Sequence, residues 1–145
     1  MILLDCNILL YAYDKSAPEH RRAKQWLESA FNGGEAVALP WVTVWAFVRI
    51  ATNARILRHP FRAAEVFAIV NSWLEQDNVA LVNPGPRHAE LLRRLVLGHQ
   101  ARGPQVTDAV LAALALENGA TVVSTDHDFS RFPVKWIDPL ASASS

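Results

Sequence analysis

The sequence predicts an α/β domain whose short central sheet is mainly parallel. Five short apolar runs alternate along the chain with longer segments in which apolar residues recur at helical spacing. Short strands separated by helices are typical of parallel sheets, because two parallel strands need a long connection. The chain has 145 residues, of which 51% are hydrophobic and 19% charged. This composition fits one domain with a full core and excludes a disordered chain.

The first strand is expected over residues 2–4, an apolar run that ends at Asp5. Asn7 can cap a short helix that continues to residue 13. Pro18 then opens an amphipathic helix, and a pair of glycines after residue 32 ends it.

The second strand is expected over residues 36–39, and Pro40 leads from it into a helix over residues 41–52. A further helix over residues 61–76 follows Pro60. Apolar residues at helical spacing indicate that both helices pack against the sheet.

The third strand is expected over residues 79–82, and a run of proline and glycine ends it. A helix over residues 87–101 follows, and then a helix rich in Ala and Leu that Thr107 caps. The fourth strand is expected over residues 121–124 and a short fifth strand over residues 135–137.

Charge is divided unevenly along the chain, although fourteen basic and fourteen acidic residues give a formal net charge of zero. Residues 1–39 carry four basic and five acidic groups. Residues 40–102 carry eight basic and four acidic groups, and residues 103–145 carry two basic and five acidic groups. The segment 49–62 holds four Arg and one His but no acid. A globally basic nucleic-acid binder is therefore excluded, whereas a local patch for a polyanion and a solvated helix end both stay open.

The single cysteine, Cys6, excludes a disulfide framework and a cysteine zinc site, and it fits a reducing cytosol. No His lies near Cys6 in the sequence to act as its base, so we expect Cys6 to behave as a buried apolar residue and not as a nucleophile. The longest apolar stretch, residues 36–48, is too short to cross a membrane. The N-terminus lacks the basic leader of a signal peptide. We therefore expect a cytoplasmic protein without a membrane partner.

Three aspartates are expected at the carboxyl edge of the sheet, where ligands gather in parallel α/β folds. Asp5 ends the first strand, Asp126 follows the fourth, and Asp108 opens the helix that leads into the fourth. Each alone has a structural explanation as a helix cap or a turn residue. Together they repel one another unless a cation neutralises them, and oxygen ligands suit Mg²⁺ or Mn²⁺. Such a site can activate water against a phosphodiester.

Three motifs carry these acids: Leu4-Asp5-Cys6-Asn7, Val106-Thr107-Asp108-Ala109 and Ser124-Thr125-Asp126-His127-Asp128-Phe129. Their order over nearly the whole chain resembles the PIN-domain ribonucleases, specifically the VapC toxins of bacterial toxin–antitoxin pairs. The resemblance implies a three-layer PIN-like domain over residues 1–140, with a short, mainly parallel central sheet flanked by helices. A flexible tail is expected over residues 141–145.

The resemblance also implies a metal-dependent endoribonuclease, a hydrolase of cellular RNA that uses Mg²⁺ or, in its place, Mn²⁺. In this family Asp5, Asp108 and Asp126 match the catalytic, metal-binding acids, with Asn7 and Asp128 in support. The partners implied are RNA, a VapB-type antitoxin and a second copy of the chain.

Arg49 and Arg55 are the candidate RNA-binding residues. Arg49 lies one turn after Ala46, the position at which many PIN domains carry a Glu, so we expect it to point toward the strand-end pocket. An ion pair between Arg49 and a pocket acid is the alternative. No acid occurs between Glu35 and Glu65, so the chain departs from the family pattern at the second acid.

Two other functions stay open. A catalytically weak or inactive PIN-like RNA-binding module would explain Ala46. A phosphoacceptor receiver domain would need an acidic pair near the first strand and a Lys after the last, whereas Asp5 stands alone and Lys135 lies beyond Pro133. Aromatic residues of the third and fourth helices could stack on RNA bases, but their spacing favours the core or a dimer face. These residues are Trp41, Trp45, Phe47, Phe67 and Trp73.

Overall fold

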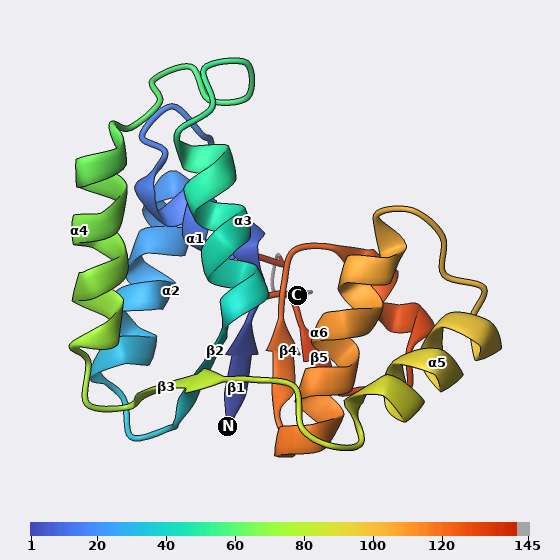
Figure 1. Cartoon of the computed structure of the whole chain (residues 1–145). Coiled ribbons are helices and arrows are strands. Elements are labelled where there is room, and N and C mark those ends of the chain that lie inside the picture. The colour runs from blue at the N-terminus through green and yellow to red at the C-terminus, as the bar shows by residue number, and fades with distance from the viewer. Residues whose placement is uncertain (142–145) are drawn as a thin grey trace.

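The computed structural model describes residues 1–141, which form five strands and six α-helices (Figure 1). The strands are β1 (Ile2–Leu4), β2 (Val37–Pro40), β3 (Val79–Val82), β4 (Thr121–Val123) and β5 (Trp136–Ile137). The α-helices are α1 (Cys6–Tyr13), α2 (His20–Asn32), α3 (Trp41–Ala51), α4 (Ala63–Leu74), α5 (His88–Gly98) and α6 (Gln105–Asn118). A 3₁₀ helix, η1 (His127–Arg131), follows β4. The expected tail lies, apart from Ala141, outside the described residues.

The five strands form one sheet in the order β3-β2-β1-β4-β5, and every pairing is parallel. The prediction of a mainly parallel sheet is therefore confirmed. In the central pair, Leu4 of β1 lies opposite Val123 of β4. The residues that follow these two positions, Asp5 and Ser124, consequently emerge together at the carboxyl edge of the sheet.

Helices cover both faces of the sheet, so the domain has three layers. Along β1, Ile2 and Leu4 pack into a core with residues of α1, α2, α3 and α4, whereas Leu3 packs into a second core with α5, α6 and η1. Figure 1 shows the same division, with α1 to α4 on one side of the strands and α5 and α6 on the other. β1 and β2 are buried along their whole length, and strands buried on both faces have continuous apolar sequences, which explains why these two could be located from the sequence.

Two predicted helix caps are wrong. Asp5, not Asn7, caps α1, because β1 passes directly into the helix and the Asp5 carboxylate accepts a hydrogen bond from the Cys6 backbone N–H. Thr107 lies inside the first turn of α6, since the fixed φ of Pro104 already suits a helix and the helix begins at Gln105. In the described part of the chain no helix has the length and apolar composition needed to cross a bilayer.

The aromatic residues of α3 and α4 are divided between the core and the surface. Phe47 and Trp73 are buried and lie edge to face, with ring centroids 4.7 Å apart, and Trp73 Nε1 donates to the Tyr13 hydroxyl at 2.9 Å. By contrast, Trp45 and Phe67 are 65% and 53% exposed. The expectation of a core position therefore holds for only part of this set.

Candidate active site

Asp5 is fixed at the junction of β1 and α1 by hydrogen bonds to both carboxylate oxygens. Its Oδ1 accepts from the Cys6 backbone N–H at 2.7 Å, and its Oδ2 accepts from the Ser124 hydroxyl at 2.6 Å. The Asp5 backbone N–H donates to the carbonyl of Val123 on the neighbouring strand β4. The side chain thus has one orientation at the strand end, and each oxygen keeps a free lone pair.

Ser124 joins the two strand ends, and the sequence reasoning did not select it. Its buried hydroxyl donates to Asp5 and accepts from Asn7 Nδ2 at 3.1 Å and from the Asp126 backbone N–H at 3.0 Å. These three bonds use the full hydrogen-bonding capacity of a hydroxyl. Asn7 completes the link, because its Oδ1 accepts from the Thr125 backbone N–H at 3.3 Å. The sequence feature that could have indicated Ser124 is its position at a strand end, two residues before Asp126.

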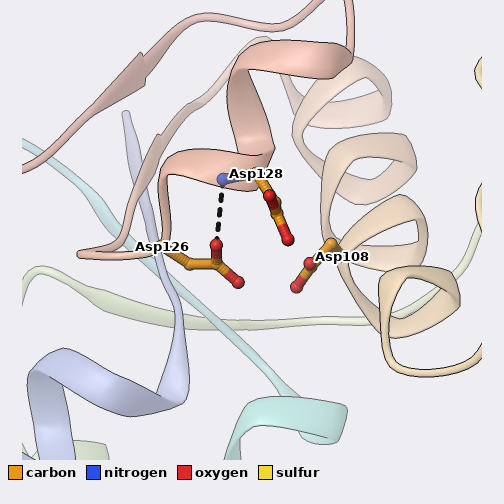
Figure 2. Close-up of side chains that lie close together, drawn as sticks. All are labelled: Asp108, Asp126 and Asp128. Atoms are coloured by element: carbon orange, nitrogen blue, oxygen red, sulfur yellow. Dashed lines mark hydrogen bonds between the residues drawn. The ribbon is translucent and has the colours of Figure 1, made fainter.

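Three carboxylates converge beside this network. Asp108 from the first turn of α6, Asp126 after β4 and Asp128 of η1 each offer one oxygen, and these oxygens lie within 4.8 Å of one another. Figure 2 shows Asp108 and Asp128 pointing toward each other, and Asp126 accepting a hydrogen bond from the Asp128 backbone N–H at 2.9 Å. Asp5 does not belong to this trio and is connected to it through Ser124.

Crowding raises the affinity of these acids for protons. Burial, followed by the charges of Asp126, Asp5 and Asp128, raises the pKa of Asp108 to about 7. Burial also raises the pKa of Asp5, although the hydrogen bonds from Ser124 and Cys6 act in the opposite direction. Negative charge at this strand edge is therefore poorly compensated within the described residues, and the cluster offers an oxygen-only ligand set to a cation.

Arg49 of α3 is exposed, and its positive charge acts on Cys6, the residue that follows Asp5. Burial and the charge of Asp5 raise the pKa of the Cys6 thiol to about 12, and Arg49 opposes that rise. Among residues 1–141, Arg49 takes part in none of the ion pairs, so the alternative of an ion pair with a pocket acid is not formed. Arg55 is exposed in the segment between α3 and α4. The Cys6 thiol is protonated at neutral pH, which agrees with its interpretation as a buried apolar residue.

The α3 helix brings no acid to the site. Ala46 is partly buried at the position where the family often has Glu. Instead, α3 contacts the end of β1 through Thr43, a buried residue whose hydroxyl donates to the Leu4 carbonyl at 2.8 Å. This bond anchors α3 next to Asp5 without adding negative charge.

Comparisons with known proteins agree with this geometry. The family model described as PIN domain matches residues 2–135. Ribonuclease VapC33 of Mycobacterium tuberculosis is 41% identical over 141 residues, which cover 97% of this chain and 99% of that protein. Ribonuclease VapC31 of the same species is 43% identical over 133 residues, which cover 91% and 93% of the two chains.

Solved structures show the same fold at lower identity. The toxin VapC20 of M. tuberculosis, described as cleaving the sarcin-ricin loop, superposes with a TM-score of 0.69 at 18% identity over 92% of this chain and 96% of that chain. A VapBC2 complex of Rickettsia felis bound to promoter DNA gives a TM-score of 0.69 at 16% identity over 94% and 98%. These matches remove the receiver-domain alternative. The chain belongs to the PIN-domain family and, within it, to the VapC ribonucleases.

Proposed function

We propose that this chain is the toxin of a type II toxin–antitoxin pair, a cytoplasmic metal-dependent endoribonuclease that cleaves cellular RNA. The observation that carries the proposal is the group of carboxylates at the carboxyl edge of the sheet, in a chain about 40% identical to VapC ribonucleases over nearly its full length. The proposal treats residues 1–140 as a single catalytic domain.

Asp5, Asp108 and Asp126 are the proposed metal-binding and catalytic residues, with Asn7 and Asp128 in support. Their oxygen-only donor set fits Mg²⁺ or Mn²⁺ and offers no thiolate or imidazole to a softer ion. A bound Mg²⁺ would activate water and stabilise the charge that develops on the phosphodiester. Asn7 orients the strand-end backbone through its bond to Thr125, and Asp128 adds a third oxygen beside Asp108 and Asp126.

Arg49 and Arg55 are proposed to bind the RNA backbone. Both side chains are exposed in the acid-free segment 49–62, and the charge of Arg49 acts on Cys6, next to Asp5. Arginine suits phosphate because its planar guanidinium offers paired donors. A VapB-type antitoxin and a second copy of the chain are the proposed protein partners, and the exposed aromatic residues of α3 and α4 favour the second copy.

Cleavage of a pool of structured RNAs by the purified chain tests this function. We expect cleavage with Mg²⁺ or Mn²⁺, none in a chelator, and a loss of more than about 100-fold in Asp108→Asn. Asp77→Asn is the matched control, because Asp77 is an exposed acid between α4 and β3 that takes no part in the cluster. Cleavage that persists in the chelator and in Asp108→Asn would contradict the proposal.

A noncatalytic RNA-binding module is the second candidate, and Ala46 in place of the family Glu is the observation that favours it. Measuring RNA binding and RNA cleavage on the same sample distinguishes the two candidate functions. If the chain binds the RNA pool but no metal condition yields cleavage products, the noncatalytic function is correct.

A further inference from the structure

We propose that Arg131, paired with Gln105, is a positioning residue that sets the separation of the carboxylates of Asp108 and Asp128. The inference rests on the proposed function, since it concerns how this chain prepares its metal-binding acids. The contact that carries it joins the two elements that bring these acids together. Arg131 Nη1 of η1 donates to Gln105 Oε1 of α6 at 2.8 Å.

The Arg131–Gln105 contact lies one turn from each acid. Gln105 precedes Asp108 by three residues on α6, so both side chains lie on the same side of the helix. Arg131 follows Asp128 by three residues on η1, and side chains three apart in a 3₁₀ helix eclipse each other. Figure 2 shows the carboxylates of Asp108 and Asp128 facing each other, and the Arg131–Gln105 hydrogen bond joins the same two elements, α6 and η1.

The first turn of α6 has no side-chain cap. Its N-cap, Pro104, provides no side-chain hydrogen bond, and the preceding loop contains two residues with positive φ, Gln100 and Gly103. Gln105 Oε1 also accepts from the Arg102 backbone N–H at 3.2 Å, so one amide oxygen connects the loop, the helix start and η1. Without that oxygen, repulsion between the carboxylates on α6 and η1 would favour their separation.

Arg131 binds a neutral amide and not an acid. Its Nε is buried without a hydrogen-bond partner, and within residues 1–141 its guanidinium forms no ion pair with a carboxylate. The cation thus stays free of Asp128, only three residues away, and binds a neutral amide instead. This arrangement leaves the oxygens of Asp128 available to a metal ion.

Two effects of Arg131 on metal binding have opposite signs, which makes the proposal testable. A positive charge near a cation site weakens cation binding, so electrostatics alone predicts that Arg131→Ala binds Mn²⁺ more tightly. Loss of the positioning contact predicts weaker binding, by about tenfold. Gln105→Ala removes this hydrogen bond, together with the longer one from the Arg102 backbone N–H, and keeps the charge of Arg131, so we expect a loss at least as large.

The experiment is titration calorimetry of the full chain with Mn²⁺ and no RNA, for the wild type, the two single variants and the double variant. We expect each single variant to bind about tenfold more weakly, and the double variant to be no weaker than Gln105→Ala, because the Arg131–Gln105 contact is already lost in that variant. Arg94→Ala is the control for charge removal, since Arg94 pairs with Glu90 on the exposed face of α5. If Arg131→Ala does not fold, Gln105→Ala still decides the outcome.

Three results would overturn the inference and leave the proposed function intact. Unchanged or tighter Mn²⁺ binding in both single variants would mean that the contact does not position the acids. Losses that add in the double variant would assign separate roles to the two residues. Unchanged Mn²⁺ binding with weakened RNA binding in Arg131→Ala would make Arg131 an RNA contact. A wild-type chain that binds no Mn²⁺ would reject the metal site of the proposed function as well, so the two failures are distinguishable.

Discussion

Replacing Ser124 with Ala should disturb both the stability of the fold and the geometry of the site. The hydroxyl is buried and lies between β1 and β4, where it connects Asp5, Asn7 and the backbone of Asp126. Alanine fits the same space and removes all three hydrogen bonds. The partly buried Asp5 oxygen and the Asp126 N–H would then lose their protein partner, and the cost of leaving such groups unpaired is the main effect.

The expected size follows from the three bonds. A hydrogen bond to a carboxylate is worth about 2 kcal/mol, and each of the two bonds to neutral donors about 1 kcal/mol. We therefore expect Ser124→Ala to lower the free energy of unfolding by about 4 kcal/mol. For a chain of this length that corresponds to a decrease in Tm of about 8–16 °C. Because Asp5 and Asp126 lose their common anchor, RNA cleavage should also fall by about tenfold or more.

Thermal unfolding by circular dichroism in metal-free buffer, together with the RNA cleavage assay, measures both effects. Ser72→Ala is the matched control, because Ser72 is exposed on α4 and its hydroxyl bonds only to the Ile69 carbonyl of the preceding turn. The control should change Tm by no more than about 2 °C. If Ser124→Ala unfolds within about 2 °C of the wild type and cleaves RNA normally, Ser124 does not hold the two strand ends together.

Four further outcomes are expected. Asp5→Asn should abolish cleavage and growth inhibition while the chain stays folded, and full toxicity of a folded variant would remove Asp5 from the metal-binding set. In metal-free buffer the folded chain holds the proton of Asp108 up to about pH 7, above the ordinary pKa of 3.8, so Tm should fall as pH rises from about 4 to about 7. Asp108→Asn should flatten that decline, and an equally steep profile would refute the pKa assignment. Arg49→Ala should weaken RNA binding and reduce the salt slope by about one unit, whereas an unchanged slope with a lowered Tm would indicate a structural role. Sedimentation equilibrium at micromolar concentration should give about twice 16.1 kDa, and a mass near 16.1 kDa would contradict the homodimer.

The strands could be located from the sequence because local composition determines them. Both faces of β1 are buried, so Ile2, Leu3 and Leu4 are all apolar and the run is visible without any knowledge of its neighbours. The order of the strands depends on pairings between distant segments, and no local pattern encodes which strand lies next to β1. The helix starts were missed for a related reason. Asp5 and Asn7 both have the chemistry of a cap, and only the three-dimensional path of β1 into α1 decides between them.

The placement of the candidate acids was predictable where it depends on strand ends, and contacts between elements were missed. Asp5, Asp108 and Asp126 follow from the rule that parallel strands gather ligands at their carboxyl edge. Nothing in the local sequence distinguishes Ser124 from an ordinary turn serine. It bonds to Asp5 only because Leu4 lies opposite Val123, which brings the two strand ends together. The partners Gln105 and Arg131 are 26 positions apart and belong to no motif.

The absence of an acid on α3 changes the electrostatics of the site as well as its ligand count. In family members with Glu at this position, α3 adds negative charge beside the first acid. Here the same helix supplies Thr43, which bonds to the Leu4 carbonyl, and Arg49, whose charge acts on Cys6, the residue after Asp5. One fewer carboxylate and one nearby cation reduce the attraction for a divalent metal and also the repulsion of an RNA phosphate. This chain should therefore depend more than such members on the precise placement of the remaining acids, which Ser124 and the Arg131–Gln105 contact supply.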